Sequence, residues 1–282
     1  MCVGWRCAPP AALDDREMHG TACVVRRQDV FLTSKVAPKD LGYEETLQAA
    51  ERTLQQLQTD CTRLVCCLCA RARVQRLTCR VARVAAAAAP DLDLYLVHWP
   101  ARAKLPPDSA QHAGWRERTW MAMMELARRG RCRAIGVSNF SAAHLREMQR
   151  YAGELMPHVN QVECHPRWRD RAVEHACAEL GVQVQAYSPL GGGALLHDAD
   201  VAAAAHLCGR PTVSLLLGWC VQHHRLPAVV KSAHAERVRE NVAALSTPAP
   251  AGADQLQAAY AALDSLQAQH ATKYCWNPAR VV

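Results

Sequence analysis

Short apolar runs alternate with amphipathic stretches from about residue 29 onward, and this rhythm is the main structural signal in the sequence. Several runs are apolar on both faces, which is typical of strands buried in a parallel sheet. Six of them have the length and the branched aliphatic content of strands. They are Val30–Ser34, Leu92–His98, Cys132–Ser138, Val159–Glu163, Val182–Ser188 and Leu226–Lys231.

Helical periodicity fills the intervals between these runs. Glu44–Thr59 carries four aliphatic residues on one face at helical spacing. Ser141 and Asp170 are placed as N-caps of two later helices, and Pro211 suits the first turn of another. The remaining helices are expected at Trp115–Arg129, Ala235–Leu245 and Asp254–Gln269, and the capped ones run through Met148, Leu180 and towards Gln222.

Repeated strand–helix–strand order predicts parallel strands joined by helical crossovers. A closed α/β barrel and an open, doubly wound sheet both satisfy this order. Gly191, Gly192 and Gly193 are consecutive, and no strand is followed by the spaced glycines of a dinucleotide-binding fingerprint. The absence of that fingerprint favours the barrel.

Two segments interrupt the rhythm. Residues 1–28 show no strand–helix unit, and only Ala22–Val25 is a short apolar run. Residues 61–90 contain six arginines, five cysteines and no acidic residue, between a helix and a strand that a few residues should connect. We expect 61–90 to be an insertion of low complexity in a domain that covers 29–282.

Charge and cysteine content exclude several function classes. The formal net charge is +7, and the arginines of 61–90 account for six of these charges, so nucleic acid is not an expected partner. The 14 cysteines show no paired metal-ligand spacing, and we predict no metal site among them. No apolar run reaches the length of a membrane span and no leader pattern opens the chain, so we expect a cytoplasmic protein without membrane contact.

Polar or ionisable residues follow each predicted strand. In parallel barrels the reactive groups gather at the carboxyl ends of the strands. A polar-rimmed pocket is therefore expected at that end of the sheet. The residues are Lys35, His98, Ser138–Asn139, Gln161 through His165, Tyr187–Ser188 and Lys231–Ser232.

The segments around these residues resemble the successive strand-end motifs of the aldo-keto reductases. The match covers roughly residues 29–60 and 91–282. The resemblance implies a (β/α)8 barrel that binds NADPH without a Rossmann domain and reduces a small-molecule aldehyde or ketone by hydride transfer. The motifs are FLTSK (31–35), DLDLYLVHWP (91–100), AIGVSNFS (134–141), VNQVECHP (159–166), VQAYSPLGGG (184–193) and VVKSAHAERVREN (229–241).

The resemblance also implies catalytic roles. The family uses a tetrad of Asp, Tyr, Lys and His, in which the tyrosine is the general acid. Lys35 and His98 match the lysine and the histidine, and Trp99 is expected to wall the substrate site. The Tyr has no counterpart, because no tyrosine precedes Lys35 and Tyr43 follows it in the sequence. The Asp has none either, because Asp14 and Asp15 are not followed by the family motif. A positioned general acid contributes about 10²–10⁴-fold to the rate, so we expect this chain to be nearly inactive.

The cofactor side of the resemblance is more complete. Matching residues are present for all four parts of the family's cofactor site: the carboxamide contacts, the ring-stacking position, the 2′-phosphate site and the adenine contacts. A dianionic phosphate favours several charge-assisted donors, so NADPH is preferred to NADH. The residues are Ser138, Asn139 and Gln161 for the carboxamide, Tyr187 for the ring, Lys231, Ser232 and Arg237 for the phosphate, and Glu240 and Asn241 for adenine; Ser188 and Leu190 are further cofactor-binding residues.

Only six of eight barrel strands are visible, and the first two are missing. The strands that begin at Val30 and Leu226 should then be open edges, which predicts poor solubility. Ala22–Val25 or residues 62–69 are the available substitutes for the missing strands.

We expect a monomer. A non-catalytic NADP-binding protein and a non-functional fragment remain as alternatives to an active reductase.

Overall fold

The computed structural model of the protein describes residues 2–5, 27, 30–59, 66–68, 92–246 and 252–282. The short apolar run Ala22–Val25, considered as a substitute strand, and most of the low-complexity segment 61–90 lie outside the described residues. The proposed domain boundaries therefore stay predictions.

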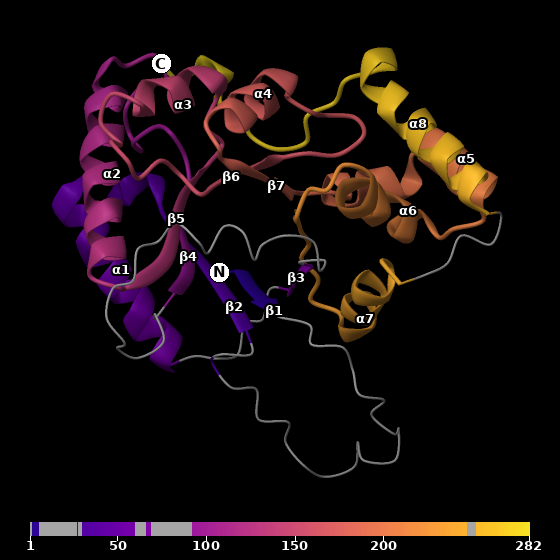
Figure 1. The fold of residues 1–282 in the computed structure, drawn as a ribbon, viewed down its shortest axis with the longest axis horizontal. Helices are drawn as coiled ribbons and strands as arrows, with labels where there is room; N and C mark the ends of the chain where they lie inside the picture. Colours follow the sequence, from indigo (N-terminus) through magenta and orange to yellow (C-terminus); the bar gives the residue numbers. More distant parts are fainter. Residues whose placement is uncertain (1, 6–26, 28–29, 60–65, 69–91, 247–251) are drawn as a thin grey trace, which may run out of the picture.

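Six strands run parallel and in sequence order around most of a ring (Figure 1). Each is paired in parallel with the next, as expected for strand–helix–strand units. The predicted α/β barrel class is confirmed. The strands are β2 (Val30–Val36), β4 (Leu92–Val97), β5 (Cys132–Ser138), β6 (Val159–Glu163), β7 (Gln183–Tyr187) and β8 (Ala228–Val229).

Two short strands close the ring between β8 and β2. β1 (Cys2–Trp5) pairs antiparallel with β2, and β3 (Cys66–Leu68) pairs antiparallel with β8. β1 and β3 are parallel to each other. The expectation of two open edges is wrong, because these strands occupy the two places where parallel strands are missing. Of the two substitutes considered, the segment 62–69 supplies β3, whereas β1 comes from four residues that showed no strand signal.

Helices cover the outside of the ring, and two of them begin at the predicted N-caps Ser141 and Asp170. The Ser141 hydroxyl accepts from the His144 amide, and Nδ1 of His144 accepts from the Ser141 amide, which makes a reciprocal capping box. The Asp170 carboxylate likewise accepts from the amide of Val173. These helices are α1 (Tyr43–Thr59), α2 (Gln111–Arg128), α3 (Ala142–Met148), α4 (Arg171–Glu179), α6 (Thr212–Gly218), α7 (Ala235–Ala243) and α8 (Ala253–Gln269).

One α-helix was not predicted from the sequence. α5 (Ala199–Cys208) begins at Asp198, whose carboxylate accepts from the amides of Asp200 and Val201, and it ends at Gly209. Its alanines lie on buried and exposed faces alike, so no apolar stripe marks it. Figure 1 shows α5 and α8 packed together at one flank, with α1 and α2 packed together at the other.

Aliphatic and aromatic side chains fill the space between the ring and the helices. β4 is buried along its whole length, and Trp120 of α2 is buried against the same core. Trp219 is buried in a single π-helical turn, η5 (Trp219–His223), that continues α6. Among the described helices none is by itself long and apolar enough to cross a membrane; α5 and the α6–η5 helix reach that length only as a pair bent by 88°.

A buried carboxylate joins three neighbouring strands. Asp93 of β4 accepts from the amide of Leu32 in β2 at 2.8 Å. Its two oxygens also pair with Arg27 at 2.9 Å and with Arg133 of β5 at 3.2 Å. These bonds satisfy a charge that would be costly to bury alone, and they fix β4 between its neighbours.

Candidate functional site

The strand register brings the predicted site residues to one end of the ring. Ser138 pairs with Gln161, Glu163 pairs with Tyr187, and Tyr187 pairs with Val229, two residues before Lys231. Parallel neighbours share the same carboxyl edge of the sheet. The predicted rim of polar side chains therefore exists around β5, β6, β7 and β8.

A continuous hydrogen-bond network links the residues at this rim. The Tyr187 hydroxyl donates to Oδ1 of Asn139 at 2.8 Å. Nδ2 of Asn139 donates to the Ser138 hydroxyl and to the His98 carbonyl, each at 3.1 Å. The Ser138 hydroxyl in turn donates to the carbonyl of Gln161 at 2.8 Å. The network holds five residues from four strand ends in one fixed arrangement.

Two residues of this rim adopt left-handed backbone conformations. Asn139 has φ 65° and Ser188 has φ 51°, values that are uncommon for residues other than glycine. Both stand directly after a strand, where a left-handed residue ends the strand and turns the chain across the rim. Such strain persists only where the surroundings fix it, and it occurs preferentially at functional sites.

Lys35 and His98 lie beside the network. Nζ of Lys35 donates to Oε1 of Gln161 at 2.5 Å, and Nε2 of Gln161 donates to Gln185 at 2.7 Å. His98 keeps an accessible surface, yet partial enclosure by protein and the nearby Lys35 ammonium lower its pKa to about 4. The imidazole is therefore neutral at pH 7, and one ring nitrogen can donate a hydrogen bond.

The C-terminal tail lies against the same rim. Glu163, at the end of β6, accepts from Nζ of Lys273 at 2.6 Å, from the amide of Tyr274 at 2.7 Å and from Nε2 of His165 at 3.1 Å. Burial alone would raise the pKa of Glu163, but these donors lower it to about 2. The tail is thereby bound to the strand end through a buried carboxylate.

Side chains of the tail approach the predicted site residues. The Cys275 thiol lies 3.5 Å from the Ser188 hydroxyl. The Trp276 ring meets the Trp99 ring edge-on, with 6.1 Å between centroids, and 79% of Trp276 is exposed. Glu163 is one of the predicted rim residues, but the sequence did not indicate its bonds to Lys273 and Tyr274, which lie more than 100 positions away.

A second buried group holds the last residues of the chain. Arg116 of α2 makes two bonds to Glu147, at 2.5 and 3.0 Å, and donates to the Val282 carbonyl at 2.9 Å. Nε2 of His144 lies 3.0 Å from the Val281 carbonyl. Residues 273–282 are thus fixed at both ends, with the Trp99–Trp276 contact between them.

The predicted phosphate-binding residues surround the start of α7. Lys231 and Arg237 are exposed, and within the described part of the chain neither makes an ion pair. Ser232 accepts from the amide of His234 at 3.1 Å, which shapes the turn before the helix. Of the remaining predicted residues, Glu240 is exposed, Asn241 is buried and Leu190 packs against the core.

Comparison with known proteins gives the family. The sequence profile of the Aldo/keto reductase family matches residues 89–263, more than half of the chain. The chain belongs to this family. Glyoxal reductase from Bacillus subtilis is 35% identical over 217 residues, which is 77% of this chain and 63% of the relative. Aldo-keto reductase family 4 member C11 from Arabidopsis thaliana is 34% identical over 241 residues, covering 80% of this chain and 65% of the relative.

Solved aldo-keto reductase structures share the fold. Apo Gox0644 superposes with a TM-score of 0.66 at 26% identity, covering 89% of this chain and 75% of the other. A Gox0644 mutant in complex with NADPH gives 0.63 at 27% identity, covering 85% and 71%. The chain spans 62% to 65% of the length of the first curated relatives that it matches.

Proposed function

We propose that the protein binds NADPH at the strand-end rim and serves the reduction of small aldehydes or ketones to alcohols. The observation that carries this proposal is the position of the Tyr187–Asn139 hydrogen bond, at the same end of the ring as Lys231 and Arg237, which are exposed and make no ion pair with another described residue. A flat aromatic surface and two exposed cations at one end of the ring suit a nicotinamide ring and a phosphate. A related protein named glyoxal reductase and the Gox0644 mutant solved in complex with NADPH support this interpretation.

The two ends of the rim differ in their fit to the cofactor. Lys231 and Arg237 have no competing carboxylate within the described residues, so they can accept a phosphate without losing a partner. Ser138, Asn139 and Gln161 are buried and already hydrogen-bonded to one another or to Lys35. Binding of a carboxamide there requires an exchange of partners, most simply of the Lys35–Gln161 bond. The residues therefore fit NADPH. The donors for the phosphate are available, whereas the donors and acceptors for the carboxamide are occupied by hydrogen bonds to one another and to Lys35.

Bound NADPH would supply a hydride to the carbonyl carbon of the substrate. The chain itself contributes the neutral His98 imidazole, which can donate to the carbonyl oxygen, and the Trp99–Trp276 pair, which can exclude water from one side. We assign Tyr187 and Asn139 to positioning of the nicotinamide ring. We assign Ser188 and Leu190 to the wall next to it, and Glu240 and Asn241 to adenine.

A second candidate function is nucleotide binding without turnover. No tyrosine precedes Lys35 in this sequence, and the Lys35 ammonium is bound to the Gln161 side chain at 2.5 Å. Because residues 1–34 contain no tyrosine, that segment offers Lys35 no phenol whose pKa it could lower. The acid step would then depend on water, which is a weak donor at pH 7.

We also propose that the protein is a monomer, that it acts on small molecules and that it works in the cytoplasm.

Fluorescence titration of the purified chain with NADPH and with NADH tests the proposal, followed by NADPH oxidation in the presence of glyoxal and of a simple aldehyde. Tighter binding of NADPH with measurable turnover supports the reductase. Tighter binding of NADPH without turnover supports the non-catalytic alternative. Equal affinity for the two nucleotides, or none, contradicts both.

A further inference from the structure

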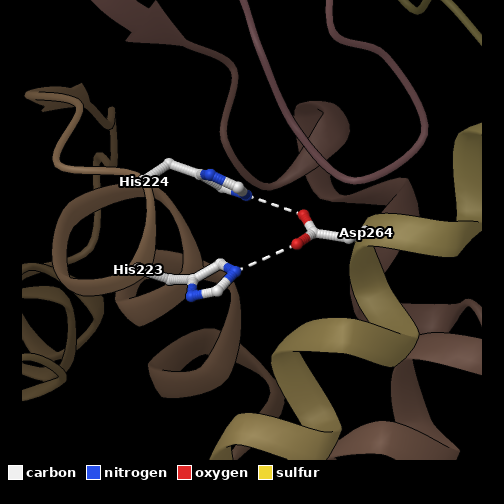
Figure 2. A group of neighbouring side chains, drawn as sticks. All are labelled: His223, His224 and Asp264. Atoms are coloured by element: carbon white, nitrogen blue, oxygen red, sulfur yellow. Dashed lines mark hydrogen bonds and ion pairs between the residues drawn. The ribbon is translucent and has the colours of Figure 1, made fainter.

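Two adjacent histidines and an aspartate form a compact cluster away from the strand-end rim (Figure 2). Nε2 of His223 lies 2.9 Å from Oδ2 of Asp264, and Nε2 of His224 lies 2.7 Å from Oδ1. The three ligand atoms all lie within 4.8 Å of one another. The histidines precede β8, whereas Asp264 belongs to α8, so none of the three takes part in the cofactor rim.

The local backbone explains how two consecutive residues face the same carboxylate. Neighbouring side chains on an α-helix point in directions that differ by about 100°. Here the chain between Trp219 and His223 forms a π-helical turn, and His224 follows it as the C-terminal cap. Single π-turns are rare and occur frequently at functional sites. The wider turn lets both imidazoles reach the two oxygens of Asp264, as Figure 2 shows.

We propose that His223, His224 and Asp264 bind a divalent transition-metal ion such as Zn²⁺. Two imidazole nitrogens and one carboxylate oxygen are the ligand set of three-ligand zinc sites, in which water completes a tetrahedron. Zinc–nitrogen bonds of about 2.0–2.1 Å set the ligand atoms roughly 3.3 Å apart. The present separations of 2.9 and 2.7 Å run to different oxygens of Asp264, so binding of the ion requires that both widen by about half an ångström and that the carboxylate turns to present one oxygen.

Groups around the cluster hold the three ligands in place. Nε1 of Trp219 donates to Oδ1 of Asp264 at 3.0 Å, and the His223 ring stacks on Tyr260 with 4.9 Å between centroids. Such outer contacts orient ligands in protein metal sites. Arg169 lies 2.8 Å from both ring nitrogens of His224, and its charge is compensated by two 2.7 Å bonds to Glu174.

Coordination through Nε2 moves the imidazole proton of His224 to Nδ1. Arg169 cannot accept that proton, so in the metal-bound form it must draw back onto Glu174. The ion would join the π-turn to α8. The chain leaves α8 at Gln269 and reaches the Glu163 anchor at Lys273, so the site would also stabilise the start of the tail.

Titration with Co²⁺ tests the site, because its absorption spectrum distinguishes nitrogen and oxygen ligands from thiolates. We expect visible d–d bands without a thiolate charge-transfer band. The bands should be lost, with at least about a tenfold drop in affinity, in His223→Gln and in Asp264→Asn. His206→Gln, which changes an exposed histidine of α5, is the matched control and should keep the site.

Thermal unfolding with and without Zn²⁺ gives a second readout. The wild type and the His206→Gln control should gain stability from the ion, and the two ligand variants should not. A metal-free melting temperature near the wild-type value shows that His223→Gln is folded. If Asp264→Asn fails to fold, the loss of metal binding in His223→Gln, a change at a partly exposed residue, tests the proposal alone. Retention of the bands in His223→Gln, or a spectrum with thiolate bands alone, overturns the proposal.

Discussion

Tyr187 donates its hydroxyl to Oδ1 of Asn139 across 2.8 Å, although 48 positions separate the two residues. Burial raises the pKa of Tyr187 well above its ordinary value, so the phenol remains protonated and is a permanent donor. Asn139 passes the connection on to Ser138 and to the His98 backbone. One hydrogen bond thus ties the proposed stacking surface to the segment that carries the proposed carbonyl-binding histidine.

Replacement of Tyr187 by Phe should separate the two roles of this side chain. The ring remains available for stacking, whereas Asn139 loses its donor, so we expect a stability loss of about 0.5–1.5 kcal/mol. NADPH affinity should fall only a few-fold in Tyr187→Phe and at least tenfold in Tyr187→Ala. Urea unfolding and fluorescence titration of both variants measure these effects. Equal affinity losses in the two variants would argue against stacking.

The Glu163 carboxylate should be required for attachment of the tail. Glu163→Gln removes the charge that Lys273 faces at 2.6 Å, and loss of one partner from a buried pair costs about 3–5 kcal/mol. We expect faster tryptic cleavage after Lys273 and a lower melting temperature. Glu154→Gln, at an exposed position, is the control. Unchanged cleavage in Glu163→Gln would show that the tail is held elsewhere.

Acid should weaken the fold through His144. Burial and the Arg116 charge lower the pKa of His144 to about 4, below the ordinary 6.5. The unfolded chain therefore takes up the proton first as pH falls, so the stability that is present above about pH 6.5 is lost towards pH 4. Between pH 7 and pH 5 the loss should be about 2 kcal/mol. Urea unfolding of the wild type at both pH values should show this loss, and His144→Gln should show a smaller one.

Gly136 of β5 should tolerate no side chain. A Cβ atom there would lie 2.5 Å from the Val159 carbonyl oxygen and 2.8 Å from a methyl group of Leu96. Because the first of these atoms belongs to the backbone of the next strand, β5 and β6 must separate to admit it. We expect Gly136→Ala to cost about 1–3 kcal/mol, measured by thermal unfolding. Gly114→Ala, where a Cβ meets only the end of Arg118 at 3.9 Å, is the control.

The parts of the fold that depend on local pattern could be predicted from the sequence. The six parallel strands follow from apolar runs, and the helices at Ser141 and Asp170 follow from capping residues whose bonds the structure contains. α5 could not be predicted in this way, because alanine gives little contrast between its faces. The motifs also placed Tyr187, Asn139 and Gln161 at one end of the ring, since strand ends in a parallel barrel share an edge.

Features that depend on distant pairing could not be predicted. Closure of the ring needs Cys2–Trp5 to meet β2 and Cys66–Leu68 to meet β8. Residues 62–69 could be named as a candidate strand, but neither their pairing with β8 nor the strand Cys2–Trp5 could be predicted. The cluster of His223, His224 and Asp264 joins residues about 40 positions apart, and it depends on a π-turn that no sequence signal indicated. The Lys35–Gln161 bond is also a tertiary contact, made between strands that are not adjacent in the ring.

The preference for the phosphorylated nucleotide tests the central claim most directly. Dissociation constants for NADPH and NADH should be measured for the wild type, for the double variant Lys231→Ala/Arg237→Ala and for Arg239→Ala, an exposed arginine on the same helix. Each charge-assisted bond contributes about 1.5–3 kcal/mol, so the double variant should lose at least tenfold in NADPH affinity. Its NADH affinity should stay near that of the wild type, and Arg239→Ala should retain the preference for NADPH. A wild type that binds both nucleotides equally, or a double variant that keeps the preference, would contradict the account.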